Sequence, residues 1–290
     1  MRAALPTLNL IGAGRVGQTL GRLWTQTGVF AVQDVLTTSL ASAQAACEFM
    51  GAGTPSPGLD AMRAADLWLI ATTDAQIAAA TTALAQQAVA KGSPPATIAF
   101  HCSGALGADQ LAPLAALGWR TASAHPILSF ANPESACAQF AGTPCALEGD
   151  AGACAQLHQA FSAIGAQCFD VRSQDKLLYH AAAVFATNFV PVLQALAEDA
   201  WRNSGVPQAL LPHLRESLLK NAVANITRFG PHGALTGPAA RGDTAAIARQ
   251  AEAVAQWDEA AGAAYSALSA LALRMANTNN TTDTSAANRR

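Results

Sequence analysis

The sequence predicts an α/β fold with a mostly parallel sheet in its first part, followed by an all-helical part. Short apolar runs alternate with helical patterns up to about residue 171, an order typical of parallel strands joined by crossover helices. The first run ends in glycines spaced as G-x-G-x-x-G. From Ser173 onward every periodic segment is helical. We therefore expect a dinucleotide-binding domain over residues 1–172, a helical domain over 173–276 and a disordered polar tail over 277–290.

The glycine-spaced loop carries the main functional signal at the start of the chain. An apolar strand over residues 8–11 leads into it, and an amphipathic helix that stops at Gly28 follows it. In such loops the glycines permit a tight turn, a close approach to a pyrophosphate and close packing of helix on strand. The N–H groups at the helix N-terminus then hold the phosphates. The expected cofactor-binding residues of this loop are Gly12, Ala13, Gly14, Arg15, Val16 and Gly17.

The end of the second strand bears on which cofactor is bound. Asp34 lies at about the distance where a ribose-binding carboxylate is expected, but two apolar residues continue the strand beyond it. The tip itself carries hydroxyls and no acid that would repel a 2′-phosphate. Arg15 could pair with that phosphate, or it could be a solvated side chain of the first helical turn. These features favour NADP, with NAD possible. The expected cofactor-binding residues at the tip are Thr37, Thr38 and Ser39.

Polar residues also follow three later strands, over residues 66–71, 97–100 and 120–124, where a parallel sheet opens into its ligand crevice. The last two of these strands each end in a histidine, which either lines the site or is a satisfied structural residue. We interpret Cys102 as a small packing residue, because no activating environment is readable around it. We expect Thr72, Thr73, His101 and Ser103 to bind cofactor, and Ser103 and His125 to bind substrate.

The first long helix of the second part, over residues 174–203, carries a polar stripe on an apolar surface. Lys176 and His180 are four residues apart and share a face, and Thr187 and Asn188 follow near that face. The stripe could simply face solvent. We favour an acid/base role for Lys176 or His180, because the helix is too apolar to be freely exposed and buried polar groups need partners.

A loop rich in glycine and proline, over residues 230–243, separates two later helices. Asp243 is suited to cap the helix that follows. Arg241 could bind a carboxylate or phosphate with both ends of its guanidinium. We expect Thr236 and Arg241 to contact substrate, together with Asn188.

Composition excludes several classes of partner. The formal net charge of −2 and the lack of a basic patch argue against nucleic acid. The most apolar segment, residues 181–197, is interrupted by Asn188 and Pro191, so we expect a buried helix and no membrane span. The six cysteines include no C-x-x-C pair. With no readable leader, they indicate reduced thiols in a cytoplasmic protein.

Several of these motifs together resemble a known family. The N-terminal part is similar to the NADP-binding domain of deazaflavin-dependent NADP oxidoreductases and pyrroline-5-carboxylate reductases. The C-terminal part resembles an all-helical domain of unknown function that is usually fused to that Rossmann-like domain. The resemblance implies a Rossmann fold, a helical domain like that of 6-phosphogluconate dehydrogenase, and a homodimer formed through the helices. The matching segments are residues 12–17, 101–104, 125–126, 176–182, Asn188, 235–238 and 241–243.

The chain departs from related β-hydroxyacid dehydrogenases at one functional position. There, a lysine acid/base is followed four residues later by a substrate-orienting asparagine, whereas here Lys176 is followed by His180. The second strand also lacks the arginine common in related NADP binders. We expect an NAD(P)-dependent oxidoreductase that transfers hydride to or from a small carbonyl or imine compound in the interdomain cleft. The alternatives are a non-catalytic dinucleotide-binding sensor or dimeric scaffold and, more remotely, an oxidoreductase with a deazaflavin partner.

Overall fold

The computed structural model describes residues 4–92 and 97–287. By its internal contacts the chain divides into two compact units, Met1–Ala186 and Thr187–Arg290, which are described separately. The division falls later than residue 172, where the end of the strand–helix alternation suggested a boundary. Helix α7 (Lys176–Ala183) lies with the first unit because its side chains bond to the ends of the strands.

The first unit is built on an eight-stranded sheet, in the order β3-β2-β1-β4-β5-β6-β7-β8. Neighbouring strands are parallel except that β7 runs antiparallel to β6, so the prediction of a mostly parallel sheet is confirmed. The parallel strands β1, β4, β5 and β6 therefore end at one edge, where ligands bind in open α/β sheets. The strands are β1 (Thr7–Ile11), β2 (Ala31–Leu36), β3 (Thr54–Pro55), β4 (Leu67–Ile70), β5 (Ile98–His101), β6 (Arg120–Pro126), β7 (Pro144–Gly149) and β8 (Gln167–Asp170).

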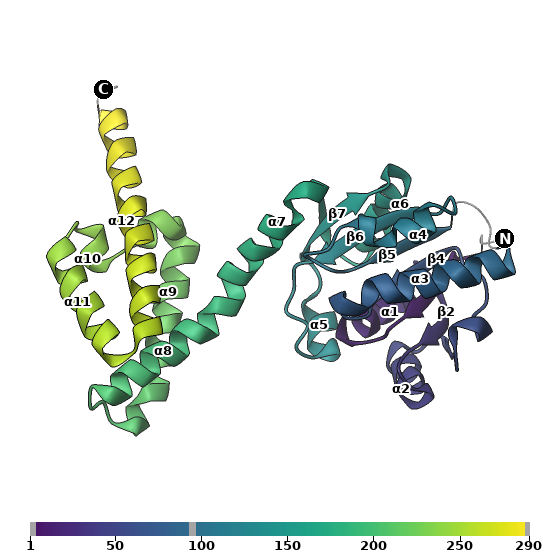
Figure 1. Ribbon diagram of the computed structural model, residues 1–290, viewed down its shortest axis with the longest axis horizontal. Coiled ribbons are helices and arrows are strands. Elements are labelled where there is room, and N and C mark those ends of the chain that lie inside the picture. The colour runs from purple at the N-terminus through teal and green to yellow at the C-terminus, as the bar shows by residue number, and fades with distance from the viewer. Residues whose placement is uncertain (1–3, 93–96, 288–290) are drawn as a thin grey trace. The chain divides into compact units, whose positions relative to one another are not determined.

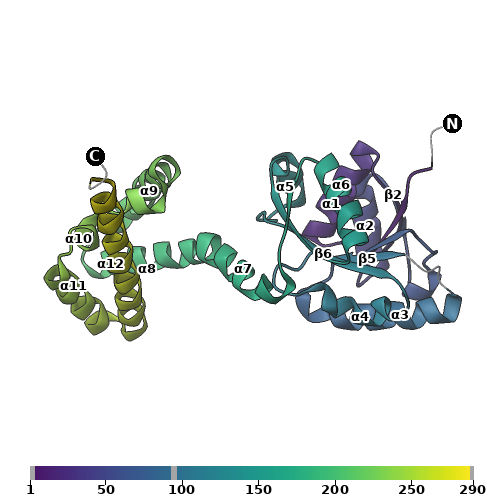
Figure 2. The same cartoon turned by 90° about the horizontal axis from the view of Figure 1, so that it is seen from above.

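Helices cover both faces of this sheet, as seen from above in Figure 2. Side chains alternate along each strand, so Leu8 and Leu10 enter one apolar cluster and Ile11 enters another. In the first cluster Trp24 donates its indole N–H to the Ala160 carbonyl at 3.0 Å, which ties α1 to α6. One face carries α1 (Arg15–Thr27), α2 (Leu40–Met50), α5 (Pro133–Gln139) and α6 (Ala151–Ala163), and the other carries α3 (Asp74–Lys91) and α4 (Ala112–Ala115).

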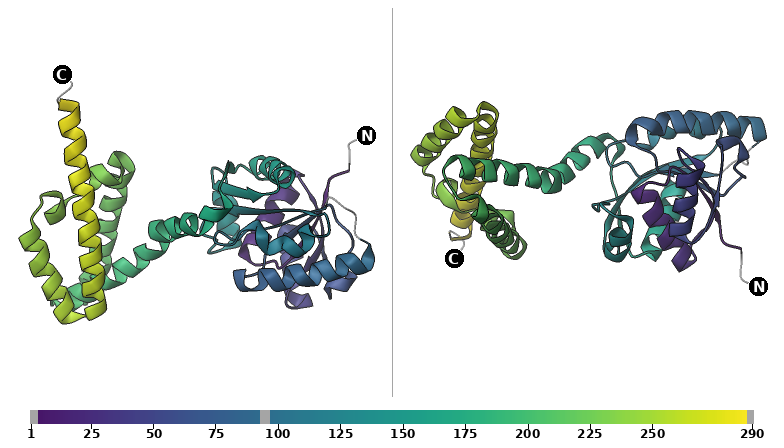
Figure 3. Two further views of the ribbon diagram at one scale, coloured as in Figure 1. Left: turned by 45° about the horizontal axis from the view of Figure 1, so that its top comes forward. Right: turned by 90° about the horizontal axis from the view of Figure 1, so that it is seen from below.

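In its described residues the second unit consists of helices joined by short loops, with no strand (Figures 1 and 3). We expected residues 277–290 to be disordered, but α12 continues to Ala287. A hydrogen bond from the Thr278 hydroxyl to the Arg274 carbonyl belongs to this extension, and residues 288–290 lie outside the description. The helices are α8 (Phe189–Asn203), α9 (Leu211–Ala234), α10 (Gly237–Ala240), α11 (Thr244–Trp257) and α12 (Glu259–Ala287).

The expected single helix over residues 174–203 differs from the structure in two ways. A π-helical turn, η4 (Val184–Asn188), interrupts it. This turn shifts Asn188 away from the position that regular α-helical spacing from His180 predicts. The segment Ser173–Asn203 is long and apolar enough to cross a membrane by length and composition, and none of its most apolar window is buried. The structure therefore does not show the expected burial over the most apolar part of this segment.

Candidate functional site

The glycine loop joins the ends of β1, β2 and β4. Gly12 has a φ of 83°, and its N–H donates to the Leu36 carbonyl at 2.7 Å. A Cβ on Gly12 would lie 2.7 Å from the carbonyl atoms of Ala71, so no side chain fits there. Gly17 packs more loosely, with a virtual Cβ 3.1 Å from the Gly12 carbonyl oxygen. These two glycines therefore make the turn and bring α1 against the strands.

Gly14 differs, because nothing lies within 4 Å of the position its Cβ would take. It is the N-cap residue of α1 and offers no side chain to the first turn, which contains no acid. The N–H groups of a 13-residue helix thus begin at an open surface beside Arg15. Such a terminus is suited to an anionic group.

The hydroxyls predicted at the neighbouring strand ends lie on the same edge of the sheet. The Thr37 hydroxyl donates to the Ser39 carbonyl at 2.8 Å, and the Ser39 hydroxyl accepts from the backbone of Ser42 to cap α2. Thr72 and Thr73 follow β4, and Thr73 is the N-cap residue of α3. The edge thus combines the starts of three helices with hydroxyl groups.

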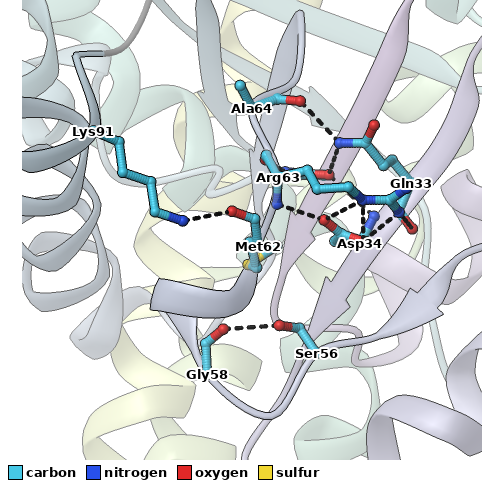
Figure 4. A network of polar contacts seen from close by, with 9 residues as sticks. Gln33, Asp34, Ser56, Gly58, Met62, Arg63, Ala64 and Lys91 are labelled. Atoms are coloured by element: carbon cyan, nitrogen blue, oxygen red, sulfur yellow. Dashed lines mark hydrogen bonds and ion pairs between the residues drawn. The ribbon is translucent and has the colours of Figure 1, made fainter.

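Asp34 is not available to bind a ribose, because Arg63 occupies its carboxylate (Figure 4). The carboxylate, only 4% exposed, accepts from the Arg63 backbone at 2.7 Å and from its guanidinium at 2.6 Å. Burial alone would raise the pKa of Asp34, but the hydrogen bonds and charge of Arg63 outweigh it and lower that pKa. Lys91 bonds to the Met62 carbonyl beside this pair. The network holds the segment before β4 against β2.

His101 is a structural residue of the next turn. It is fully buried; Nε2 lies 2.9 Å from the Gly107 carbonyl oxygen, and Nδ1 accepts from the Ser103 backbone at 3.2 Å. These partners fix a neutral ring with its proton on Nε2, and burial lowers the pKa of His101. The Ser103 hydroxyl donates to the Asp74 carboxylate at 2.8 Å, which joins the β5 turn to the start of α3.

Lys176 begins α7 and is only 3% exposed. Its ammonium donates to the Ser103 carbonyl at 3.0 Å, in the turn after β5, and to the Ser123 hydroxyl at 2.5 Å, on the neighbouring strand β6. Burial lowers the pKa of this ammonium, and the negative charge of Glu148 partly opposes that effect. Lys176 therefore fastens α7 to the sheet edge.

His125 and His180 meet above Gly104. Their ring centroids are 5.8 Å apart, and a Cβ on Gly104 would lie 2.4 Å from His180 Nδ1 and 2.8 Å from His125 Nε2. His125 Nδ1 is 2.8 Å from the Tyr179 hydroxyl. His180 Nδ1 is buried without a hydrogen-bond partner among the described residues. This unpartnered nitrogen marks a place where a polar ligand atom would be stabilised.

The sequence-predicted residues thus divide between the two units. The loop, the strand-end hydroxyls, His101, Ser103, His125, Lys176 and His180 all belong to the first unit. Asn188, Thr236 and Arg241 belong to the second, so their role with substrate stays a prediction. Thr236 lines a cavity of about 280 Å³ whose other lining residues belong to α9. Asp243 caps α11 by accepting from Ala246, as predicted.

Sequence reasoning missed three contacts of this edge. Tyr179 was given no role in the predicted site, although a tyrosine beside His180 on an apolar helix is a usable signal. Ser123 is a polar residue inside a buried strand, a second signal. Asp74 is the first residue of α3, and Thr73 is its N-cap residue. The residues next to Asp74 in the sequence do not indicate that its carboxylate accepts from the Ser103 hydroxyl.

Comparison with known proteins agrees with this architecture. The family model for a Rossmann-like domain matches residues 1–126, and that for a domain of unknown function, DUF2520, matches residues 143–272. No curated protein matches the sequence.

Solved structures resemble the chain over most of its length. Protein TM1727 from Thermotoga maritima is 23% identical with a TM-score of 0.73, over 94% of this chain and 99% of that one. An imine reductase from Myxococcus stipitatus in complex with NADP+ is 19% identical (TM-score 0.61, 90% and 92% covered). A 1-pyrroline-5-carboxylate reductase from Streptococcus pyogenes is 15% identical (TM-score 0.58, 94% and 100% covered). The two domain matches thus follow one another along this chain, a Rossmann-like domain first and a DUF2520 domain second.

Proposed function

We propose that the chain is an NADP-dependent oxidoreductase that transfers hydride between the nicotinamide and a small carbonyl or imine compound. The observation that carries the proposal is the open N-terminus of α1 at Gly14, on the sheet edge that also holds a buried polar array around Lys176. The first feature suits a pyrophosphate, and the second suits a reacting polar group. When bound, the dinucleotide would supply the hydride, and the chain's own residues would orient substrate and handle the proton.

Cofactor choice rests on the tip of β2. Asp34 is held by Arg63, so no free carboxylate of the described residues stands at this tip to repel a 2′-phosphate. Arg15 is exposed at the first turn of α1. A resembling imine reductase is described in complex with NADP+, which agrees with this preference. NADPH should therefore bind more tightly than NADH.

The preference for NADPH can be tested on Arg15. Loss of a charge-assisted hydrogen bond to phosphate should weaken NADPH binding about tenfold or more in Arg15→Gln and leave NADH binding unchanged. Arg22→Gln is the matched control, since Arg22 lies on the same helix but stacks on Phe49 at 4.6 Å. Equal weakening of both cofactors, or of neither, would contradict the role of Arg15.

The acid/base would be Lys176 or His180. Lys176 is a buried ammonium with two acceptors, and His180 has a buried unpartnered nitrogen. Replacing each by alanine should reduce turnover and leave cofactor affinity nearly intact. Unchanged turnover in both variants would remove this assignment.

Activity itself is tested by mixing the full chain with NADPH and panels of ketoacids, aldehydes and imines, and following cofactor oxidation. Oxidation with at least one compound class is expected. Tight NADPH binding without any oxidation across the panel would instead support a sensor or scaffold.

A homodimer through the helical unit is the expected assembly. Several large apolar side chains of α8 and α9 are exposed, which a second copy would cover. The six cysteines are free, in agreement with a reducing, cytoplasmic location. Sedimentation should show a dimer at micromolar concentration, and Ile226→Glu should weaken it more than Lys220→Gln on the same helix. A monomeric wild type would refute the proposal. The exposed side chains are Phe189, Val192, Leu193, Leu218, Ile226 and Phe229.

A further inference from the structure

We propose that His125 presents a neutral Nε2–H donor at the sheet edge, that Tyr179 fixes this tautomer, and that the group His125 recognises is a substrate carbonyl oxygen and not an iminium ion. The proposal rests on the proposed function, because it names the substrate class of that site. It assigns His125 a role in recognition and Tyr179 a positioning role. The transferred proton stays with the acid/base considered above.

The geometry of His125 leaves one ring nitrogen occupied and the other free. Nδ1 is 2.8 Å from the Tyr179 hydroxyl, and the two rings stand at 90° with centroids 5.6 Å apart. Phe169 packs edge-on against the phenol ring at 6.2 Å. Among the described residues no hydrogen bond joins Nε2 to a partner, and the Gly104 backbone lies against this nitrogen, since a Cβ on Gly104 would be 2.8 Å from Nε2 and 2.4 Å from His180 Nδ1.

The direction of the hydrogen bond follows from what each group can donate. In the described part of the chain, the Tyr179 hydroxyl has His125 Nδ1 as its one hydrogen-bond partner. If Nδ1–H donated to the phenol oxygen, the phenol proton would have no protein acceptor, and an unmade donor in a half-buried place is costly. The phenol therefore donates to Nδ1, and the neutral ring carries its proton on Nε2.

The surroundings keep this ring neutral. Burial, the neighbouring His180 and the Lys176 ammonium together lower the pKa of His125 to about 4, while Asp74 acts in the opposite direction. Tyr179 faces the ring from α7, and burial raises the pKa of its hydroxyl. His125 is thus a poor proton reservoir near pH 7 but a permanent hydrogen-bond donor, which polarises an acceptor without giving up its proton.

A fixed neutral donor discriminates between a carbonyl compound and an iminium ion, in which the imine nitrogen has no free lone pair. A carbonyl oxygen has lone pairs that accept from Nε2–H, and the electron pair pushed onto it by hydride addition strengthens that bond. An iminium nitrogen has no lone pair. Its positive charge would also meet a donor N–H near the Lys176 ammonium. Specificity would arise from this mismatch as much as from the favourable contact.

The tautomer can be measured on the full chain without any substrate, by ¹⁵N NMR of the histidine side chains. Wild type should show His125 neutral with its proton on Nε2 from pH 8 down to pH 5. Tyr179→Phe should mix the two tautomers, and Tyr265→Phe, which removes the other tyrosine hydroxyl and its bond to Gln250, should not. A proton on Nδ1, or titration of His125 near pH 6.5, would overturn the proposal.

The recognised group is tested with an active preparation. Ketones, aldehydes or ketoacids should be reduced, and a fixed N-methyl iminium of similar size should not. His125→Gln, which keeps a neutral N–H donor, should retain roughly tenfold more kcat/KM than His125→Leu, the size of one hydrogen bond. Reduction of the iminium alone, or equal activity of the two variants, would overturn the assignment. A shift of the His125 resonance on addition of oxidised cofactor alone would also overturn the assignment. In that case the group that accepts from His125 would be the carboxamide of the nicotinamide and not a substrate carbonyl.

The two proposals fail in different ways. If no compound is reduced, the proposed function fails, and the NMR result still decides the tautomer. If carbonyl compounds are reduced and the NMR shows the His125 proton on Nδ1, the proposed oxidoreductase function is supported and the proposed role of His125 is refuted.

Discussion

Replacing Gly12 and Gly14 by alanine, one at a time, separates the structural role of the glycine loop from its proposed role in binding. At Gly12, alanine must adopt a φ of 83°, and its Cβ would lie 2.7 Å from backbone atoms of Ala71 that cannot swing aside. At Gly14, φ is −71° and ψ is −163°, which alanine adopts without strain, and the Cβ position is open.

The expected changes in the free energy of unfolding have opposite signs. Left-handed backbone costs an alanine about 1–2 kcal/mol, and overpacking against rigid atoms costs about 1–3 kcal/mol more, so Gly12→Ala should lose roughly 2–5 kcal/mol. Gly14→Ala should gain about 0.4–1 kcal/mol, because alanine restricts the unfolded chain. Its Cβ, however, would stand where a pyrophosphate must approach. NADPH should then bind at least about tenfold more weakly, a loss of about 1.4 kcal/mol.

Urea unfolding followed by the fluorescence of the buried tryptophans of the first unit, Trp24, Trp68 and Trp119, measures the free energy of unfolding. A titration followed by NADPH fluorescence measures the affinity for NADPH. If Gly14→Ala binds NADPH as wild type does, the dinucleotide is not held at this loop. If Gly12→Ala is as stable as wild type, the account of the strained turn is wrong.

Three further variants test other parts of the first unit. Arg63→Gln should lower the free energy of unfolding above about pH 4, because the guanidinium is what lowers the pKa of Asp34. The difference in the free energy of unfolding between wild type and variant should shrink as the pH falls through that lowered pKa. Urea unfolding across pH 3–7 measures it. A Lys176→Met variant removes the donor to Ser103 with little change in volume, so circular dichroism should show a folded chain while NADPH oxidation falls about a hundredfold or more; full activity would contradict a role in the site. Cys102→Ala should leave turnover within about twofold, because burial raises the pKa of the thiol to about 12 and no thiolate forms near pH 7; strong loss would reveal a nucleophile.

Local patterns sufficed to predict the sheet edge. A glycine at the end of an apolar strand has few explanations apart from a tight turn, and Gly12 makes that turn. A polar residue at the end of a buried parallel strand must lie at the ligand edge, which placed His125 and Ser103 correctly on that edge. Both inferences need only the chain within a few residues of the position.

Partners far apart in sequence could not be predicted in the same way. Asp34 looked like a weak ribose ligand because its partner Arg63 is 29 residues away. Tyr179 and His125 are 54 residues apart and meet only once α7 lies against β6. The antiparallel direction of β7 was also unreadable, since an apolar run has the same pattern in either direction.

The π-helical turn η4 affects how this chain should be aligned with others. A π-turn contains one residue more than the α-helical turn it replaces, and the side chains after it are rotated by about 100°. In a related helix without the turn, the spatial counterpart of Asn188 would therefore stand one position nearer to the counterpart of Lys176. A single-residue gap belongs within Val184–Asn188, and motif spacings counted across it will differ by one. Such a turn is the expected trace of one inserted residue that the helix absorbed without breaking.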